Sequence, residues 1–310
     1  MRLSTPAPAK VNLVLRVGPL RPDGFHDLLT LLVPLDLADG VEVAISARRG
    51  PVRCRVPARP ELDGAENLAA RAAELFRARF GVHNGVSIRI AKRIPVIAGL
   101  GGGSSDAAAV LRCLARAFRV RDARAVAALA LEVGSDVPFF LGEGPAWARG
   151  RGERLTPADV PVQHLVLLYP RDPALAIRAG DAYRWLDASR EASGAPVPPL
   201  PRTPGRLRPS HVGNDLQPAC LARVPALSTL LGRLTEGGAS AVMMSGSGPT
   251  VFGAFPARRA AAEAARKIAK EEGAATSKVE VVLARTMRRH PRVTSWRSPR
   301  SASSPSTKRS

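Results

Sequence analysis

A glycine-rich segment between a strand-like run and a helix-like run constrains the fold of this chain more than any other feature. Four of the five residues in segment 99–103 are glycine, and Ser104 and Ser105 follow. Residues 86–90 alternate apolar and polar side chains as a strand does, and residues 104–118 form an alanine-rich run typical of a helix. A strand, a loop and a helix in this order predict an α/β or α+β protein.

The same segment suits the binding of phosphate groups. Glycines let backbone N–H groups approach a polyanion closely, and the positive end of the following helix dipole adds to the attraction. Ser104 and Ser105 can cap the helix, or donate hydroxyl groups to phosphate oxygens or to the water shell of a metal ion. A flexible turn with a serine cap is the alternative interpretation. The candidate phosphate-binding residues are Pro95, Val96, Ile97, Ala98, Gly99, Leu100, Gly101, Gly102, Gly103, Ser104 and Ser105.

Three familiar motifs of other enzyme classes are absent from the sequence. No glycine is followed directly by lysine, so there is no Walker A motif. None of the five G-x-G triplets continues into the dinucleotide-binding fingerprint, and no G-x-S-x-G nucleophile elbow occurs. These absences argue against a P-loop protein, a Rossmann dehydrogenase and a serine hydrolase of the usual type.

Phosphoryl transfer needs a positive charge beside the phosphates and often a carboxylate that takes the proton of the attacking hydroxyl. Lys10 lies in an apolar strand-like run, where a lone lysine is unusual, and Asp136 lies between Gly134 and Pro138, where a carboxylate can be held rigidly. These two residues are the candidate catalytic pair. Taken singly, Lys10 could be a solvated charge at a strand edge and Asp136 an ordinary turn or cap residue.

A second glycine-rich segment, residues 245–250 (SGSGPT), joins two predicted strands. Its glycines would let a bound ligand approach the backbone closely, and a tight β-connection is the alternative interpretation.

The length of 310 residues exceeds what a single core of about 100 to 150 residues usually organises, so we expect two domains. We place an N-terminal domain at 1–160, a C-terminal domain at 161–287 and a basic, disordered tail at 288–310 that contributes nothing to catalysis. Residues 188–209 predict an exposed loop. Strands are expected at 9–17, 28–35, 41–46, 86–90, 163–169, 241–244, 250–254 and 279–283, and helices at 66–80, 104–118, 122–133, 217–234 and 257–272.

The formal charge of +20 raises the question of a nucleic-acid partner. Only 4% of the residues are aromatic and no basic-aromatic interleaving occurs, so we do not expect specific binding of nucleic acid. Three widely spaced cysteines and five scattered histidines predict neither a disulfide framework nor a metal site formed by side chains. No signal peptide and no membrane-spanning run is apparent, which predicts a cytoplasmic protein without a membrane partner. The oligomeric state stays open.

Three segments, taken together and in this order, resemble the GHMP kinase superfamily of small-molecule kinases. They are residues 8–13 (PAKVNL), 95–106 and 245–252. Four features resemble the branch of this superfamily that phosphorylates a cytidylated methylerythritol in non-mevalonate isoprenoid synthesis. These are AKVNL at 9–13, RPDGFH at 21–26, GSDVP at 134–138 and NDL at 214–216.

The resemblance covers about residues 6–285. The Pro/Arg-rich stretch 195–209 and the tail from residue 288 do not belong to the family pattern. The resemblance implies a two-domain GHMP kinase fold, with an N-terminal domain like domain 2 of ribosomal protein S5 and a ferredoxin-like C-terminal domain. It also implies ATP and Mg²⁺, with the phosphates over residues 95–105 and Asn67 near the adenine.

The resemblance further implies roles for the side chains around the acceptor substrate. Asp136 would take the proton of a 2-hydroxyl group as it attacks the γ-phosphate, and Lys10 would stabilise both the carboxylate and the developing charge. Asn12 would help to position the substrate, and His26 would bind the cytosine with the ring of Phe25 stacked on it. The family usually has tyrosine at Phe25, so a hydroxyl group is lost while the stacking face is kept.

Two other functions are compatible with parts of this pattern. Another GHMP kinase acting on homoserine, mevalonate or a sugar would share the ATP loop, but homoserine and mevalonate kinases lack the DGFH segment at 23–26. A catalytically inactive binding protein with the same fold would have no need for both Lys10 and Asp136.

Overall fold

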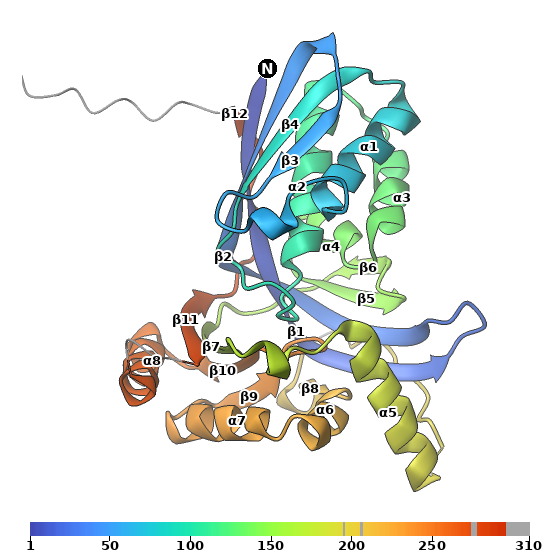
Figure 1. Cartoon of the computed structure of the whole chain (residues 1–310). Coiled ribbons are helices and arrows are strands. Elements are labelled where there is room, and N and C mark those ends of the chain that lie inside the picture. The colour runs from blue at the N-terminus through green and yellow to red at the C-terminus, as the bar shows by residue number, and fades with distance from the viewer. Residues whose placement is uncertain (195, 205–206, 274–277, 296–310) are drawn as a thin grey trace, which may run out of the picture.

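The computed structural model of the chain describes residues 1–194, 196–204, 207–273 and 278–295. Within these ranges the chain forms two β-sheets, one of eight strands and one of four. Figure 1 shows the larger sheet with its helices in the upper part of the view and the smaller sheet with its helices in the lower part. The predicted mixed architecture is confirmed, because each sheet is covered by helices.

The larger sheet is organised around one long antiparallel hairpin. The first two strands pair along most of their length and are joined by the turn at 21–25. The central order is β12-β1-β2-β4-β3, while β5 pairs with β2, β6 with β5 and β8 with β1. The strands are β1 (Arg2–Leu20), β2 (His26–Arg49), β3 (Val52–Arg55), β4 (Asn84–Ala91), β5 (Ala146–Gly150), β6 (Arg154–Pro157), β8 (Gly213–Asn214) and β12 (Thr294–Ser295).

The helices of this half start and end where the local sequence directs. They are α1 (Leu68–Phe80), α2 (Gly102–Ala117), α3 (Ala123–Val133) and α4 (Val137–Leu141), with a 3-10 turn at Pro60–Leu62. The Asn67 side chain caps α1 by accepting from the Ala69 N–H, and Gly81 ends the helix with a φ of 64°. The run of alanines in α2 is buried, which lets this helix pack closely on β1 and α1.

The smaller sheet is antiparallel with the order β11-β7-β10-β9. Its strands are β7 (His164–Pro170), β9 (Ala241–Met244), β10 (Val251–Phe255) and β11 (Val279–Arg285). Its helices are α5 (Ala179–Ser193), α6 (Gln217–Arg223), α7 (Ala226–Glu236) and α8 (Arg258–Glu272), with 3-10 turns at Pro173–Leu175 and Pro209–His211. This strand order, with helices between the strands, is the ferredoxin-like arrangement that the resemblance implied.

A shared core joins the two sheets. Val11 and Leu31, from the β1–β2 hairpin, are buried in one cluster with Leu165 and Leu167 of β7 and Phe252 of β10. The predicted domain boundary near residue 160 falls between β6 and β7. Because the two halves share buried side chains, this common core fixes their relative position.

Several elements differ from the sequence-based expectation. The strands expected at 28–35 and 41–46 are one continuous strand, β2, because the polar stretch between them still pairs with β1. The helix expected at 217–234 is two helices, which meet at Val224 and Pro225. The expected loop at 188–209 was wrong in its first part, because α5 continues to Ser193.

The segment that follows β11 packs against the N-terminal half. The Met287 N–H donates to the Pro34 carbonyl and the His290 N–H to the Glu143 carbonyl, each at 2.7 Å. The Arg116 guanidinium donates to the Val293 carbonyl at 2.6 Å. At the edge of the sheet, β12 pairs with the start of β1.

The prediction of a disordered tail from residue 288 is therefore wrong for residues 288–295. Backbone hydrogen bonds and the buried His290 side chain, which is 8% exposed, hold this segment in spite of its basic composition. The rest of the predicted tail, 296–310, lies outside the described residues, as do residues 195, 205 and 206 of the Pro/Arg-rich stretch. In the described part of the chain, no helix is both long enough and apolar enough to span a membrane.

Candidate active site

Two neighbouring cavities meet at the glycine-rich loop. The larger has a volume of about 960 Å³ and lies between this loop, the β1–β2 hairpin and α5. The smaller has a volume of about 390 Å³ and is lined by the same loop and the start of α1. Gly99, Gly101 and Ser104 line both cavities, so the two compartments adjoin at the N-terminus of α2.

The loop adopts a backbone that requires glycine. Gly99 and Gly101 have φ angles of 73° and 70°, and Ile97 also has a positive φ of 54°. A Cβ atom at Gly99 would lie 2.2 Å from the Ser245 carbonyl oxygen, so no other residue fits there. The N–H groups at the start of α2 and the positive end of its dipole make this an anion-binding position.

The smaller cavity brings together most of the predicted nucleotide-binding residues. All ten residues from Pro95 to Ser104 line it, together with Asn67. Ser105 lines neither cavity, because it is only 1% exposed. Besides capping α1, the Asn67 amide donates to the Leu62 carbonyl at 2.9 Å, which fixes its orientation at the rim of the cavity.

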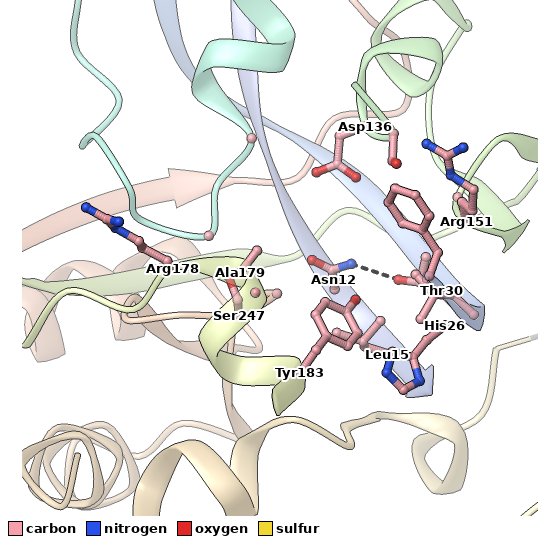
Figure 2. A pocket seen from close by; sticks show the side chains of 18 of the residues that line it. Asn12, Leu15, His26, Thr30, Asp136, Arg151, Arg178, Ala179, Tyr183 and Ser247 are labelled. Atoms are coloured by element: carbon pink, nitrogen blue, oxygen red, sulfur yellow. Dashed lines mark hydrogen bonds between the residues drawn. The ribbon is translucent and has the colours of Figure 1, made fainter. Parts of the chain in front are cut away.

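Lys10 of β1 is buried beneath the glycine-rich loop. Its side chain is 6% exposed, so it is not a solvated charge at a strand edge. The Nζ atom donates to Asn12 Oδ1 at 2.8 Å and to the Gly99 carbonyl at 3.0 Å. Asn12 in turn donates to the Thr30 hydroxyl at 2.7 Å, as Figure 2 shows. These contacts aim the ammonium group at the junction of the two cavities.

Asp136 faces Lys10 across this junction. Its Oδ2 atom lies 3.6 Å from Lys10 Nζ, and the Asp136 side chain is 37% exposed. Asp136 precedes α4, a helix anchored by Phe139 and Phe140, each of which is 1% exposed. The candidate catalytic pair is thus one buried cation and one accessible carboxylate, each held by a rigid element.

The second glycine-rich segment lies against the first. The Ser245 hydroxyl donates to the Gly99 carbonyl at 3.1 Å, and a Cβ atom at Gly246 would come within 3.1 Å of Lys10 Nζ. Asn214 Nδ2 donates to the Gly246 carbonyl at 2.7 Å, so the NDL segment fixes this turn. The turn supports the floor of the site from the C-terminal half.

Aromatic side chains line the larger cavity, and Figure 2 shows Tyr183 and His26 on the side of Asn12 that faces away from Asp136. His26 is 7% exposed and stacks on Tyr183, with ring centroids 5.3 Å apart. Its Nε2 atom lies 3.2 Å from Asp187 Oδ2. Phe25 is 44% exposed and carries the Arg151 guanidinium over its ring at 3.8 Å from the centroid.

A largely buried charged cluster forms part of the wall of the smaller cavity, which Lys92 and Asp106 line. Lys92 Nζ donates to Asp39 Oδ2 at 2.5 Å and to Asp106 Oδ2 at 2.9 Å. Burial raises the pKa of Asp106 above its ordinary value, although Lys92 opposes this. Burial alone would lower the pKa of Lys92, but the two carboxylates outweigh it and the pKa is raised, so Lys92 stays charged.

Sequence reasoning did not identify several of these residues. Tyr183 and Asp187 lie on α5, a helix that was not predicted, and Arg151 follows β5 in a stretch rich in glycine and charge. Lys92 lies just before the expected loop, but nothing in the local sequence showed that Asp39 would reach it.

Comparisons with known proteins agree with this geometry. The family model described as GHMP kinases N terminal domain matches residues 67–144, and the model described as GHMP kinases C terminal matches residues 202–275. A protein of Anaeromyxobacter dehalogenans is 72% identical over all of this chain and 99% of its own length. The chain therefore belongs to the GHMP kinase family.

Within that family, several of the most similar relatives share one name. The Anaeromyxobacter protein and one of Deinococcus radiodurans, which is 43% identical over 84% of this chain and 86% of its own length, are both named 4-diphosphocytidyl-2-C-methyl-D-erythritol kinase. A crystal structure named 4-(cytidine 5'-diphospho)-2C-methyl-D-erythritol kinase matches with a TM-score of 0.69 and 34% identity, covering 91% of this chain and 98% of its own. A homoserine kinase of Cytophaga hutchinsonii, with 16% identity, a TM-score of 0.68 and coverage of 94% of this chain and 97% of its own, shares the fold.

Proposed function

We propose that this protein phosphorylates the 2-hydroxyl group of 4-diphosphocytidyl-2-C-methyl-D-erythritol with ATP, in non-mevalonate isoprenoid precursor synthesis. The main support is the Lys10–Asp136 pair, which lies where two cavities of suitable size meet. Full-length similarity to kinases of this name supports the choice of substrate. The proposal includes a cytoplasmic location, where ATP is present as the phosphate donor.

The two cavities divide the substrates between them. The smaller cavity takes ATP, with its phosphates at the N-terminus of α2 and its adenine toward Asn67. The larger takes the acceptor, whose cytosine lies among the aromatic rings of Phe25, His26 and Tyr183. This arrangement leaves the acceptor hydroxyl near Asp136 and the γ-phosphate near Ser104.

The chemical step then needs one proton acceptor and one fixed cation. The Asp136 carboxylate takes the proton as the hydroxyl oxygen attacks the γ-phosphorus, a new O–P bond forms, and the bond to the β,γ-bridging oxygen breaks to release ADP. The Lys10 ammonium lies 3.6 Å from the Asp136 carboxylate and faces the charge that develops on the phosphoryl oxygens. Asn12 holds the Lys10 ammonium in place.

Mg²⁺ belongs to this proposal as the partner of the ATP phosphates. Among the described residues, no group of three or more histidine, cysteine or acidic side chains could hold a metal ion by itself. The Ser104 hydroxyl, which lines the cavity assigned to ATP, suits an ion that keeps its waters and is bound mainly by phosphates. Bound there, Mg²⁺ would neutralise phosphate charge.

The test is ATP consumption by the purified protein with Mg²⁺ and one acceptor at a time. We expect turnover with 4-diphosphocytidyl-2-C-methyl-D-erythritol and none with homoserine, mevalonate or galactose. Turnover with one of the other acceptors would overturn the substrate and keep the kinase chemistry. ATP binding without turnover on any acceptor would favour an inactive binding protein.

A further inference from the structure

The two ends of the glycine-rich loop are tied together at the wall of the smaller cavity, by side chains of which two, Lys92 and Asp106, line it. Asp39 of β2 accepts hydrogen bonds at one Oδ1 atom from the N–H groups of Arg93 and Ile94, at 2.5 and 2.9 Å. These residues open the loop. Asp106, the fifth residue of α2, follows its other end. Lys92 Nζ bridges the two carboxylates.

This bridge is shielded from water. The side chains of Lys92, Asp39 and Asp106 are 9%, 0% and 4% exposed. Charge pairs in such surroundings are weakly screened, and removing one partner leaves an uncompensated charge. The paired charges therefore join β2, the end of β4 and α2 at a place where water screens them little.

The loop that the bridge spans contains a backbone conformation that is unfavourable by itself. Ile97 has a positive φ, a conformation that β-branched residues rarely adopt. A Cβ atom at Gly102 would lie 3.1 Å from Ile94 Cγ2 and 3.2 Å from Lys92 Nζ, so the start of α2 rests directly on the opening of the loop. The loop ends are held together while the residues between them stay open to ligand.

We propose that Lys92, Asp39 and Asp106 form a positioning bridge that holds the phosphate-binding loop in its nucleotide-binding shape. The three residues act through the loop rather than on the reacting atoms. This inference rests on the proposed function, because it assigns the smaller cavity to ATP. Losing the bridge weakens ATP binding specifically, since the larger cavity is lined by neither Lys92 nor Asp106.

The test compares Lys92→Met with Lys92→Arg, Asp106→Asn and the double variant Lys92→Met/Asp106→Asn. Lys267→Met, on the exposed face of α8, is the matched control. Binding of MgATP is measured by calorimetry without acceptor, and KM for each substrate and kcat by steady-state kinetics. Thermal unfolding reports the stability of each variant.

We expect Lys92→Met to weaken MgATP binding at least about tenfold, because small displacements of a binding loop are costly. KM for the acceptor should change less than about twofold on the same reasoning, and Lys92→Arg should recover most of the ATP affinity. The double variant lowers the number of uncompensated buried charges. We therefore expect the double variant to fold even if Lys92→Met alone does not. We also expect it to bind MgATP weakly.

Unchanged MgATP affinity in a folded Lys92→Met or double variant would overturn the bridge. So would equal losses for both substrates that follow the loss in thermal stability. If the wild-type protein binds no MgATP, the proposed function fails instead. If the wild type is active and the variants match the Lys267→Met control, the inference alone fails.

Discussion

At the scale of single residues, the site depends on how differently its charged side chains are buried. Lys10 is enclosed and hydrogen-bonded to Asn12 and Gly99, while Asp136 is open to the larger cavity. A fixed cation beside an accessible carboxylate suits a base that must reach its substrate and a positive charge that must face the phosphates.

Asp136→Asn should abolish turnover, by a factor of at least about a hundred, because the amide cannot accept the proton. Binding of MgATP should be nearly unchanged, since Asp136 does not line the smaller cavity. Single-turnover assays and calorimetry measure the two effects separately. Turnover within tenfold of wild type would remove Asp136 as the base.

His290 should make the protein sensitive to acid. Its ring packs edge-on to Phe139 and Phe140, and neither ring nitrogen has a partner among the described residues. Burial, with a smaller contribution from Arg112, lowers the pKa of His290 from 6.5 to about 4. The unfolded chain therefore binds the proton first as the pH falls, and stability is lost between about pH 6.5 and pH 4.

The size of this loss is about 3 kcal/mol for the pKa shift of His290. Chemical unfolding at pH 7.5, 6 and 4.5 should show a steeper decline for wild type than for His290→Phe, which cannot titrate. Parallel curves for the two proteins would show that His290 is not the sensitive group.

At the scale of elements, the segment 286–295 is a strap that crosses the N-terminal half. Its Met287 contacts β2 and its His290 contacts the turn after α4. Its Val293 carbonyl accepts a hydrogen bond from Arg116 of α2. Because α4 follows directly on Asp136, the strap also supports the element that carries the candidate base. The sequence-based expectation that residues from 288 onward contribute nothing to catalysis ignores this contact.

A chain that ends at residue 287 should be less stable than one that ends at residue 295, by a few kcal/mol and thus by about 5 °C or more in Tm. Its kcat should fall, because α4 loses its support. Its KM for ATP should change by a smaller factor, because the glycine-rich loop keeps its own contacts. Differential scanning fluorimetry and steady-state kinetics on the two truncated chains measure this. Identical behaviour of both chains would show that the strap is dispensable.

At the scale of the whole molecule, the two halves are joined by a common core. Leu31 of β2 is fully buried in the cluster that also holds side chains of β7 and β10. The active site lies along this junction, with Lys10 from one half resting against Gly246 of the other. The cleft therefore depends on both halves being folded.

Leu31→Ala should lower the free energy of unfolding by about 2 to 5 kcal/mol, as expected for a buried leucine. The loss should appear in a single cooperative transition, because the cluster belongs to both sheets. Leu283→Ala, at a leucine that is 42% exposed, is the control and should have a small effect. Two separate transitions in calorimetry would contradict a shared core.

The sequence by itself determined the features that are local. Glycine at positive φ, an apolar run around Lys10, and the periodicities of strand and helix are properties of neighbouring residues, so the loop, the order of the motifs and the family were all predictable. The unpredicted α4 and α5 carry weaker local patterns, because α4 has only five residues and only Ala182 and Leu186 of α5 are buried.

Only the tertiary structure decided which distant side chains meet. The 3.6 Å approach of Lys10 to Asp136, the stacking of Tyr183 on His26 and the bridge from Lys92 to Asp39 each join residues far apart in the sequence. The packing of residues 288–295 against the N-terminal half is of the same kind, since their basic composition suggested a free tail. Such contacts arise from the packing of whole elements around a core, which no short stretch of sequence encodes.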